Sequence, residues 1–342
     1  MHNKTILITG VAGLLGSRLA EYIIEKKPGN TVIGIDDLSG GYESNIPSEV
    51  KFYKANTFDD SIKDIFELEQ PDIVYHFAAY AAEGLSPFVR TFNYDNNLKS
   101  TAAIVNECIK HNVERLVFTS TMAVYGHGWE GKRPFEEVDP PQPIDPYGIA
   151  KLAAEQTLEV MSSVHGFEYV NLVPHNIIGP RQKFDDPYRN VVSIMINRIL
   201  NGNPPIIYGD GSQERCFSDI DDVVYPMIES INNKQAVGET INIGPDEDVI
   251  SIKELAFKII DVLNSDMEPV FVDPRPQEVK LAHCSADKAR KLLGYKTSVT
   301  LDKSIEKIAN WIIKVGPKKF RYHLDIEILN DKTPKTWTQK LF

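Results

Sequence analysis

Short apolar runs alternate with helical stretches along the first 180 residues of the chain. The helical stretches cover Leu14–Lys26, Leu98–His111 and Ala150–Val164. The apolar runs have the length of buried strands and lie at Ile6–Thr9, Thr31–Ile35, Ile73–Phe77, Arg115–Ser120 and Tyr169–Val173. Such alternation is typical of parallel strands joined by crossover helices, so the pattern predicts an α/β fold with a doubly wound parallel sheet.

The pattern becomes less regular after residue 180. Proline and glycine clusters at Pro204-Pro205, Gly209-Asp210-Gly211 and Pro274–Pro276 separate shorter elements there. We therefore expect a larger first domain over residues 1–180 and mainly a smaller mixed α/β lobe over residues 181–342. The stretch after about residue 315 mixes Lys, Pro and Thr with aromatic residues, and predicts either an arm that wraps over the body or a partly disordered segment.

The composition excludes several classes of protein. The chain of 342 residues has 48 acidic and 37 basic side chains, a formal net charge of −11, which argues against nucleic acid as a partner. No run of 18 consecutive apolar residues is present, and the first apolar run is too short for a signal peptide, so we expect no membrane span. The scattered Cys108, Cys216 and Cys284 have no metal-binding or disulfide spacing, which predicts reduced thiols in the cytoplasm and no metal site.

Three glycines separate the first expected strand from the first expected helix. Gly10, Gly13 and Gly16 have the spacing G-x-x-G-x-x-G, and Leu14 and Leu15 lie at the helix start. Glycine permits the tight turn and lets a pyrophosphate approach the N–H groups at the start of the helix. The alternative is a glycine-rich turn without a ligand, but the position after the first strand favours a dinucleotide site.

The second expected strand ends in two acidic residues, Asp36 and Asp37, and Asp36 lies 20 residues beyond Gly16. A carboxylate at that position accepts hydrogen bonds from ribose hydroxyls and repels a 2′-phosphate, which favours NAD over NADP. The alternative is that the two residues only begin the next turn.

Tyr147 and Lys151 are four residues apart at the start of an expected helix, so both side chains lie on one face. A neighbouring cation favours the phenolate and is expected to lower the pKa of Tyr147, which makes this residue a candidate general acid and base. Ser120 and Thr121 follow the fourth expected strand at the edge of the sheet where ligands bind, so their hydroxyl groups are candidates to hold a reacting oxygen.

Together these features resemble the extended short-chain dehydrogenase/reductase family, and within it the nucleotide-sugar epimerases of the UDP-glucose 4-epimerase type. The resemblance implies a Rossmann domain that binds NAD. It also implies further cofactor contacts at Asn56, Thr57, Phe77, Ala78, Ala79 and Asn97. Substrate contacts would come from Glu83, Thr121, Asn176, Asn190, Arg215 and Arg275. The two arginines would hold the diphosphate of a nucleotide-diphosphate sugar, while His127 and His175 have no defined role.

The resemblance also implies a mechanism. Tyr147, as a phenolate, would remove the proton of the sugar C4 hydroxyl while a hydride passes to NAD. The 4-keto sugar would then turn over and take the hydride back on its other face, so that NAD is recycled. Thr121 would hold the reacting oxygen, and Lys151 would hold the nicotinamide ribose. Similar proteins pair the two helices that begin near Leu98 and Ala150, so a homodimer is expected.

Some positions depart from the family pattern. Related dehydratases carry an Asp-Glu pair after the strand-end hydroxyls, where this chain has Met122-Ala123, and this argues against dehydration. Two enzymatic alternatives stay open: epimerisation, most directly at C4, and oxidation by an NAD-dependent 4-dehydrogenase that releases a keto-sugar. A third alternative, a non-catalytic protein that senses NAD, is disfavoured because Tyr147 and Lys151 are both present.

Overall fold

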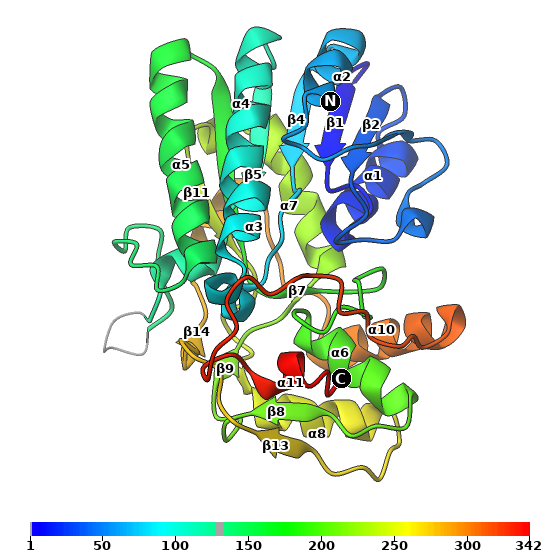
Figure 1. Cartoon of the computed structure of the whole chain (residues 1–342). Helices are drawn as coiled ribbons and strands as arrows, with labels where there is room; N and C mark the ends of the chain where they lie inside the picture. Colours follow the sequence, from blue (N-terminus) through cyan, green and yellow to red (C-terminus); the bar gives the residue numbers. More distant parts are fainter. Residues whose placement is uncertain (1, 128–132) are drawn as a thin grey trace.

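The computed structural model describes residues 2–127 and 133–342 and contains two lobes (Figure 1). Seven parallel strands form the sheet of the larger lobe in the order β11-β6-β5-β4-β1-β2-β3. They are β1 (Thr5–Thr9), β2 (Thr31–Asp36), β3 (Lys51–Lys54), β4 (Ile73–His76), β5 (Arg115–Thr119), β6 (Glu168–Pro174) and β11 (Thr240–Ile243). The predicted doubly wound parallel sheet is confirmed.

Helices cover both faces of this sheet, so its central strands are buried along their whole length. One face packs against α1 (Leu14–Lys26), α7 (Ile220–Asn232) and α9 (Asp287–Leu293). The other packs against α2 (Ser61–Glu69), α4 (Ser100–Lys110) and α5 (Pro146–His165). The short helix α3 (Arg90–Tyr94) continues through a π-helical turn, Asp95–Lys99, into α4.

The smaller lobe has its own apolar core between three helices, α6 (Val191–Leu200), α8 (Ile252–Val262) and α10 (Leu301–Val315). Short strands pair around this core: β8 (Ile206–Tyr208) with β13 (Val270–Val272), β7 (Ile177–Ile178) with β10 (Ser218–Asp219), and β9 (Glu214–Arg215) with both β12 (Ile250–Ser251) and β14 (Leu281–Ala282). A capping box starts α8, in which Ser251 and Glu254 satisfy each other's backbone N–H groups. The expected mixed α/β lobe is present.

The structure differs from the sequence prediction at three places in the larger lobe. Helix α5 begins four residues earlier than expected, because the Asp145 carboxylate accepts the Gly148 N–H at 2.9 Å and Pro146 suits a first helical position. The edge strand β3 was not expected, since its two lysines interrupt the apolar pattern. Residues beyond 180 also contribute β11, α7 and α9 to the larger lobe.

The residues after α10 form an ordered arm, Gly316–Phe342, that includes the short helix α11 (Lys335–Thr338). Figure 1 shows it in red, crossing the molecule between the larger and the smaller lobe. Among the described residues, no helix has both the length and the apolar content that a membrane crossing requires.

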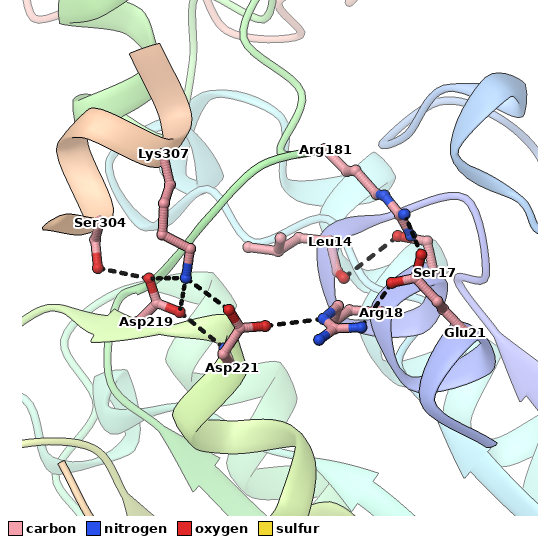
Figure 2. A network of polar contacts seen from close by, with 9 residues as sticks. All are labelled: Leu14, Ser17, Arg18, Glu21, Arg181, Asp219, Asp221, Ser304 and Lys307. Carbon is pink, nitrogen blue, oxygen red and sulfur yellow. Dashed lines mark hydrogen bonds and ion pairs between the residues drawn. The ribbon is translucent and has the colours of Figure 1, made fainter. Parts of the chain in front are cut away.

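An ionic network joins the first helix of the larger lobe to the last helix of the smaller one (Figure 2). The Asp221 carboxylate, in the first turn of α7, accepts from Arg18 Nε of α1 at 2.9 Å and from Lys307 Nζ of α10 at 2.6 Å. Lys307 also donates to the buried Asp219 at 3.0 Å, and Arg181 donates to Glu21 of α1 at 2.6 Å. The network thus fixes the position of α1 relative to the smaller lobe.

We expect the substitution Asp221→Asn to lower the free energy of unfolding by about 1 kcal/mol at low salt. It removes the carboxylate that Arg18 and Lys307 share, and both cations are partly exposed. Urea denaturation at low and high salt measures the loss, which screening should reduce. Asp60→Asn is the matched control, because Asp60 is fully exposed and pairs only with the neighbouring Lys63. Equal stability of Asp221→Asn and the unchanged protein at low salt would contradict this role of the network.

Candidate active site

A cavity of about 440 Å³ lies beyond the carboxyl ends of the strands, between the two lobes. Nearly all residues proposed from the sequence line it. From the cofactor set these are Gly10, Gly13, Leu14, Leu15, Asp36, Asp37, Asn56, Thr57, Phe77, Ala78 and Ala79. From the catalytic and substrate sets they are Ser120, Thr121, Tyr147, Lys151, Glu83, Asn176, Asn190, Arg215 and Arg275. Residues far apart in the sequence therefore meet in one space.

The glycine turn at the start of α1 leaves room for an anion. Gly10 has a φ of +74°, and a Cβ there would lie 2.8 Å from the Ala78 nitrogen. Gly13 is the N-cap of α1, and no side chain among the described residues caps that helix, so its first N–H groups stay free for a ligand. Gly16 lies behind the turn, where a Cβ would be 2.3 Å from the Gly10 carbonyl oxygen, so it permits close packing and does not line the cavity.

Asp36 lies at the end of β2 with its carboxylate fixed by the backbone. Its two oxygens accept the N–H groups of Ala12 at 2.9 Å and Leu38 at 2.7 Å, and each keeps capacity for a further donor. Burial raises the pKa of Asp36. Asn56 donates to Asp37 at 3.2 Å, which holds the neighbouring wall in place. An uncapped glycine turn beside a fixed carboxylate fits the pyrophosphate and ribose of NAD.

The Tyr147 and Lys151 side chains lie on one face of α5 and are both almost fully buried. The Lys151 ammonium donates to the Thr119 carbonyl oxygen at 2.8 Å and lies 4.5 Å from the centre of the Phe118 ring. These two contacts aim the Lys151 side chain along the end of β5, toward the cavity.

The expectation that Lys151 lowers the pKa of Tyr147 is wrong for the protein without ligands. Burial, followed by the nearby Glu83 carboxylate, raises the pKa of Tyr147, while a hydrogen bond from Thr121 acts in the opposite direction. Burial also lowers the pKa of Lys151 to about 7. The spacing of Tyr147 and Lys151 in the sequence indicates that a cation lies near the phenol. It does not indicate that both side chains are buried, and burial disfavours the phenolate and the ammonium alike.

The two strand-end hydroxyls have different partners. Ser120 donates to the Glu155 carboxylate, which lies one further turn along α5 from Lys151. Burial raises the pKa of Glu155 to about 7. Thr121 accepts the Ala123 N–H at 3.2 Å and donates its own proton toward the Tyr147 oxygen. Thr121 is therefore the hydroxyl that lies beside the phenol, while Ser120 is paired with Glu155.

A cluster of four charged side chains forms the other end of the cavity. Glu278 accepts from Arg275 at 2.8 and 2.9 Å and from Arg215 at 3.3 Å. The Glu83 side chain is exposed to the cavity, yet enough protein surrounds it that desolvation, with Asp145 nearby, raises its pKa to about 7. The two guanidinium groups keep unused donors that could bind a diphosphate despite the net charge of the chain.

The loop before α6 supplies further polar groups. Asn190 is the residue before the helix, with a φ of +72°, and its amide donates to the Lys183 carbonyl oxygen at 2.9 Å. Asn176 donates to the Cys216 carbonyl oxygen at 2.9 Å. Arg189 donates to Asp186 at 3.0 Å and to the Gly40 carbonyl oxygen at 3.3 Å, so it reaches the cofactor side of the cavity.

Three other residues named from the sequence lie away from the cavity. Asn97 is buried behind it, where its amide exchanges hydrogen bonds with the backbone of Tyr80 and so fixes the loop after β4. His127 is exposed, and His175 is buried with its Nδ1 at 3.2 Å from the Pro245 carbonyl oxygen. Among the described residues, no group of His, Cys, Asp or Glu side chains could hold a metal ion.

Sequence reasoning missed Arg189, Glu155, Trp337 and Phe342. Glu155 had a usable signal, because it continues the four-residue spacing of Tyr147 and Lys151. Arg189 directly precedes Asn190 but carries no motif of its own. Trp337 and Phe342 line the cavity only because the arm folds back, and no local pattern indicates that.

Comparison with known proteins agrees with this geometry. Residues 6–244 match the NAD dependent epimerase/dehydratase family. The chain belongs to this family. Within it, the chain is 31% identical over 310 residues to a putative UDP-glucose 4-epimerase of Methanocaldococcus jannaschii, covering 90% of this chain and 98% of that protein. It is 29% identical to the UDP-glucose 4-epimerase of Mycolicibacterium smegmatis, covering 88% and 96% of the two chains.

Solved structures of epimerases have the same fold as this family member. The UDP-glucose 4-epimerase of Thermotoga maritima, solved with UDP-glucose, has a TM-score of 0.84 and 31% identity, covering 91% of this chain and 99% of that one. The UDP-glucuronic acid 4-epimerase of Bacillus cereus, solved with UDP-glucuronic acid and NAD, has a TM-score of 0.83 and 27% identity, covering 91% and 100%. The expected family, isomerase class and NAD cofactor are confirmed.

Proposed function

We propose that this epimerase-family member is an NAD-dependent nucleotide-sugar 4-epimerase, and that its substrate is a UDP-hexose of the glucose and galactose type. The observation that carries the proposal is the position of Tyr147. It lines the same cavity as the glycine turn and the Arg215–Arg275 cluster, with Lys151 and Thr121 beside it. A ligand that bridges the cofactor end and the arginine end would thus pass the phenol. The names of the relatives support the choice of sugar.

The residues of this chain divide the work of the reaction. NAD, when bound, would supply the hydride acceptor and a positive charge that lowers the pKa of Tyr147. Tyr147 would take the proton of the sugar C4 hydroxyl as C4 is oxidised and would return it to the same oxygen as C4 regains its hydride on the other face, while Thr121 donates to the reacting oxygen. Lys151, held by the Thr119 carbonyl oxygen, would orient the cofactor ribose. Near-complete burial of both groups limits the access of water.

The wall next to the strand-end hydroxyls favours epimerisation over loss of water. Met122 and Ala123 begin the 3₁₀ turn Met122–Tyr125, and neither can protonate a leaving hydroxyl. Two carboxyl groups at the arginine end of the cavity, those of Glu83 and Glu278, lie in the electrostatic field of the two arginines. A keto intermediate formed here would therefore have a hydride to regain, while positions 122 and 123 offer no acid to expel its neighbouring group.

The proposed diphosphate contact makes Arg275 testable. We expect Arg275→Gln to weaken the binding of UDP by about 10- to 100-fold, because it removes a charged donor to the diphosphate and leaves Glu278 with fewer partners. Isothermal titration calorimetry with UDP measures this effect. Arg290→Gln is the matched control, since Arg290 pairs with Asp246 outside the cavity. If Arg275→Gln binds UDP as tightly as the unchanged protein, Arg275 does not contact the diphosphate.

The decisive experiment incubates the purified protein with a panel of UDP-, GDP-, CDP- and dTDP-sugars and follows the products by NMR. We expect interconversion of two C4 epimers of a UDP-hexose without accumulation of NADH. Release of a keto-sugar together with NADH would show instead that the protein is a 4-dehydrogenase. No isomerised product from any sugar in the panel would overturn the proposal.

We also propose a homodimer in the cytoplasm, paired through the helices that begin near Leu98 and Ala150. The apolar side chains Ile104, Val105 and Leu158 on these helices are fully buried against the sheet, so they are not available to a second copy. The apolar side chains that remain exposed on α5 are Ile149, Val160 and Val164. They support pairing through this helix, and light scattering after size-exclusion chromatography would show a monomer if the proposal is wrong.

A further inference from the structure

The C-terminal arm is fastened to both lobes around the cavity. The Glu327 N–H donates to the Phe88 carbonyl oxygen at 2.9 Å. The Glu327 carboxylate accepts the Thr91 and Phe92 N–H groups at 3.0 and 2.9 Å, which are otherwise free donors in the first turn of α3. On the other side, the Arg321 N–H donates to the Asp185 carbonyl oxygen at 2.8 Å. The middle of the arm thus crosses from the loop before α6 to the larger lobe.

The end of the arm is held equally firmly against the smaller lobe. The Thr336 hydroxyl bonds the Tyr208 hydroxyl at 2.6 Å, and the Leu341 carbonyl oxygen accepts from Arg198 at 2.9 Å. The Phe342 N–H donates to the Tyr322 hydroxyl at 3.0 Å. These hydrogen bonds use particular side chains of the arm and of the smaller lobe, so they fix where the end of the arm lies.

Two aromatic side chains of the arm form part of the cavity wall, namely Trp337 and Phe342. Trp337 is only 2% exposed and packs edge-on against Phe88 and Tyr188, with ring centres 5.9 and 5.8 Å apart. Its indole N–H is buried and has no acceptor among the described residues. A buried donor without a partner is costly, and such donors are normally completed by a ligand or a bound water.

The position of Trp337 indicates which part of a ligand it would meet. Thr336, its neighbour, bonds Tyr208, and the Tyr208 ring lies 4.6 Å below the Arg275 guanidinium. Since Arg275 is the proposed diphosphate contact, the arm lies at the diphosphate end of the cavity, away from the glycine turn. An aromatic wall with one N–H donor suits the flat face and the acceptor oxygens of a nucleoside.

We infer that the arm is a substrate-binding element, in which Trp337 determines specificity by contacting the nucleoside of the nucleotide sugar. The inference rests on the proposed function and adds a recognition residue to it. An arm needed only for stability would not have to place its aromatic side chains in the cavity wall.

The test compares two tryptophans of the chain. Trp337→Phe keeps a ring but removes the N–H donor, and Trp337→Ala removes the wall. Trp311→Phe is the matched control, because Trp311 packs between Tyr42 and Phe184 and does not line the cavity. Calorimetry measures the Kd of UDP and of UDP-glucose for each variant, and thermal unfolding without ligand reports on folding.

We expect Trp337→Phe to weaken UDP and UDP-glucose by the same factor, about 5-fold, and Trp337→Ala by about 10- to 100-fold. The change in tryptophan fluorescence on addition of UDP should be lost in Trp337→Phe and kept in Trp311→Phe. Unchanged UDP affinity in Trp337→Phe would overturn the inference, as would a loss confined to UDP-glucose, which would place Trp337 at the sugar.

The outcome separates the inference from the proposed function. If the unchanged protein binds UDP but converts no sugar, the proposed function fails while the Trp337 effect on UDP affinity can still be present. If the unchanged protein binds no nucleoside diphosphate, both fail. If Trp337→Ala unfolds, the Trp337→Phe variant, which keeps the ring, decides the question.

Discussion

Replacing Tyr147 by phenylalanine is expected to lower kcat by about 10²- to 10⁴-fold, the usual contribution of a general acid and base. The hydroxyl group is the only part removed, and the ring stays packed at the start of α5, where the Asp145 cap holds the helix. Bound NAD should remain, because the glycine turn and Asp36 are untouched. The measurement is the rate of C4 epimerisation by NMR, together with the NAD content of the purified protein.

Tyr53→Phe provides the comparison for Tyr147→Phe. The Tyr53 hydroxyl bonds Glu69 at the far edge of the sheet and takes no part in the cavity. Its loss should leave kcat unchanged. Full turnover by Tyr147→Phe would show that the proton is moved by another group.

Replacing Gly16 by alanine is expected to have the second large effect, on folding and on cofactor binding together. A Cβ at this position would lie 2.3 Å from the Gly10 carbonyl oxygen and 2.7 Å from the Val11 Cα, both backbone atoms that cannot turn aside. Helix α1 would have to move away from β1 and distort the turn that faces the pyrophosphate. We expect a loss of about 3 kcal/mol in the free energy of unfolding and loss of bound NAD.

Urea denaturation with and without added NAD measures the Gly16 effect, and absorbance after acid release gives the cofactor content. Ser17→Ala, one residue further along the same helix, removes only a weak bond at 3.4 Å to the Leu14 carbonyl oxygen and should change neither quantity. Gly16→Ala with unchanged stability and full NAD content would refute the packing argument.

The sequence predicts the sheet and the first helix well for a physical reason. Buried central strands such as β5 contain uninterrupted apolar runs, here Leu116–Phe118. Helix α1 begins directly after the glycine turn, which marks its start in the sequence. The glycines, Asp36 and the Tyr147–Lys151 pair also belong to local patterns with a fixed chemical meaning. These parts of the site could therefore be found without a structure.

Other properties depend on contacts between distant segments. The raised pKa of Tyr147 follows from burial in the complete cavity, and the Ser120–Glu155 bond follows from the packing of β5 against α5. Asn97 was expected to contact the cofactor, but its side chain hydrogen-bonds the Tyr80 backbone. It lies in the π-helical turn Asp95–Lys99, which determines where the side chain points. Trp337 and Phe342 reach the cavity only because the arm folds back over the body, and no local sequence pattern predicts that fold.

The return of β11 to the large sheet has a consequence for the order of folding during synthesis. Strand β6 has its outer neighbour only once Ile243 has been made, and α9, which covers part of one face, ends at Leu293. The segments of the smaller lobe from α6 to β10 are made before that sheet is complete. On the ribosome the edge of β6 therefore stays open while the first segments of the smaller lobe are made, and α8 and α10, which complete the core of that lobe, follow β11.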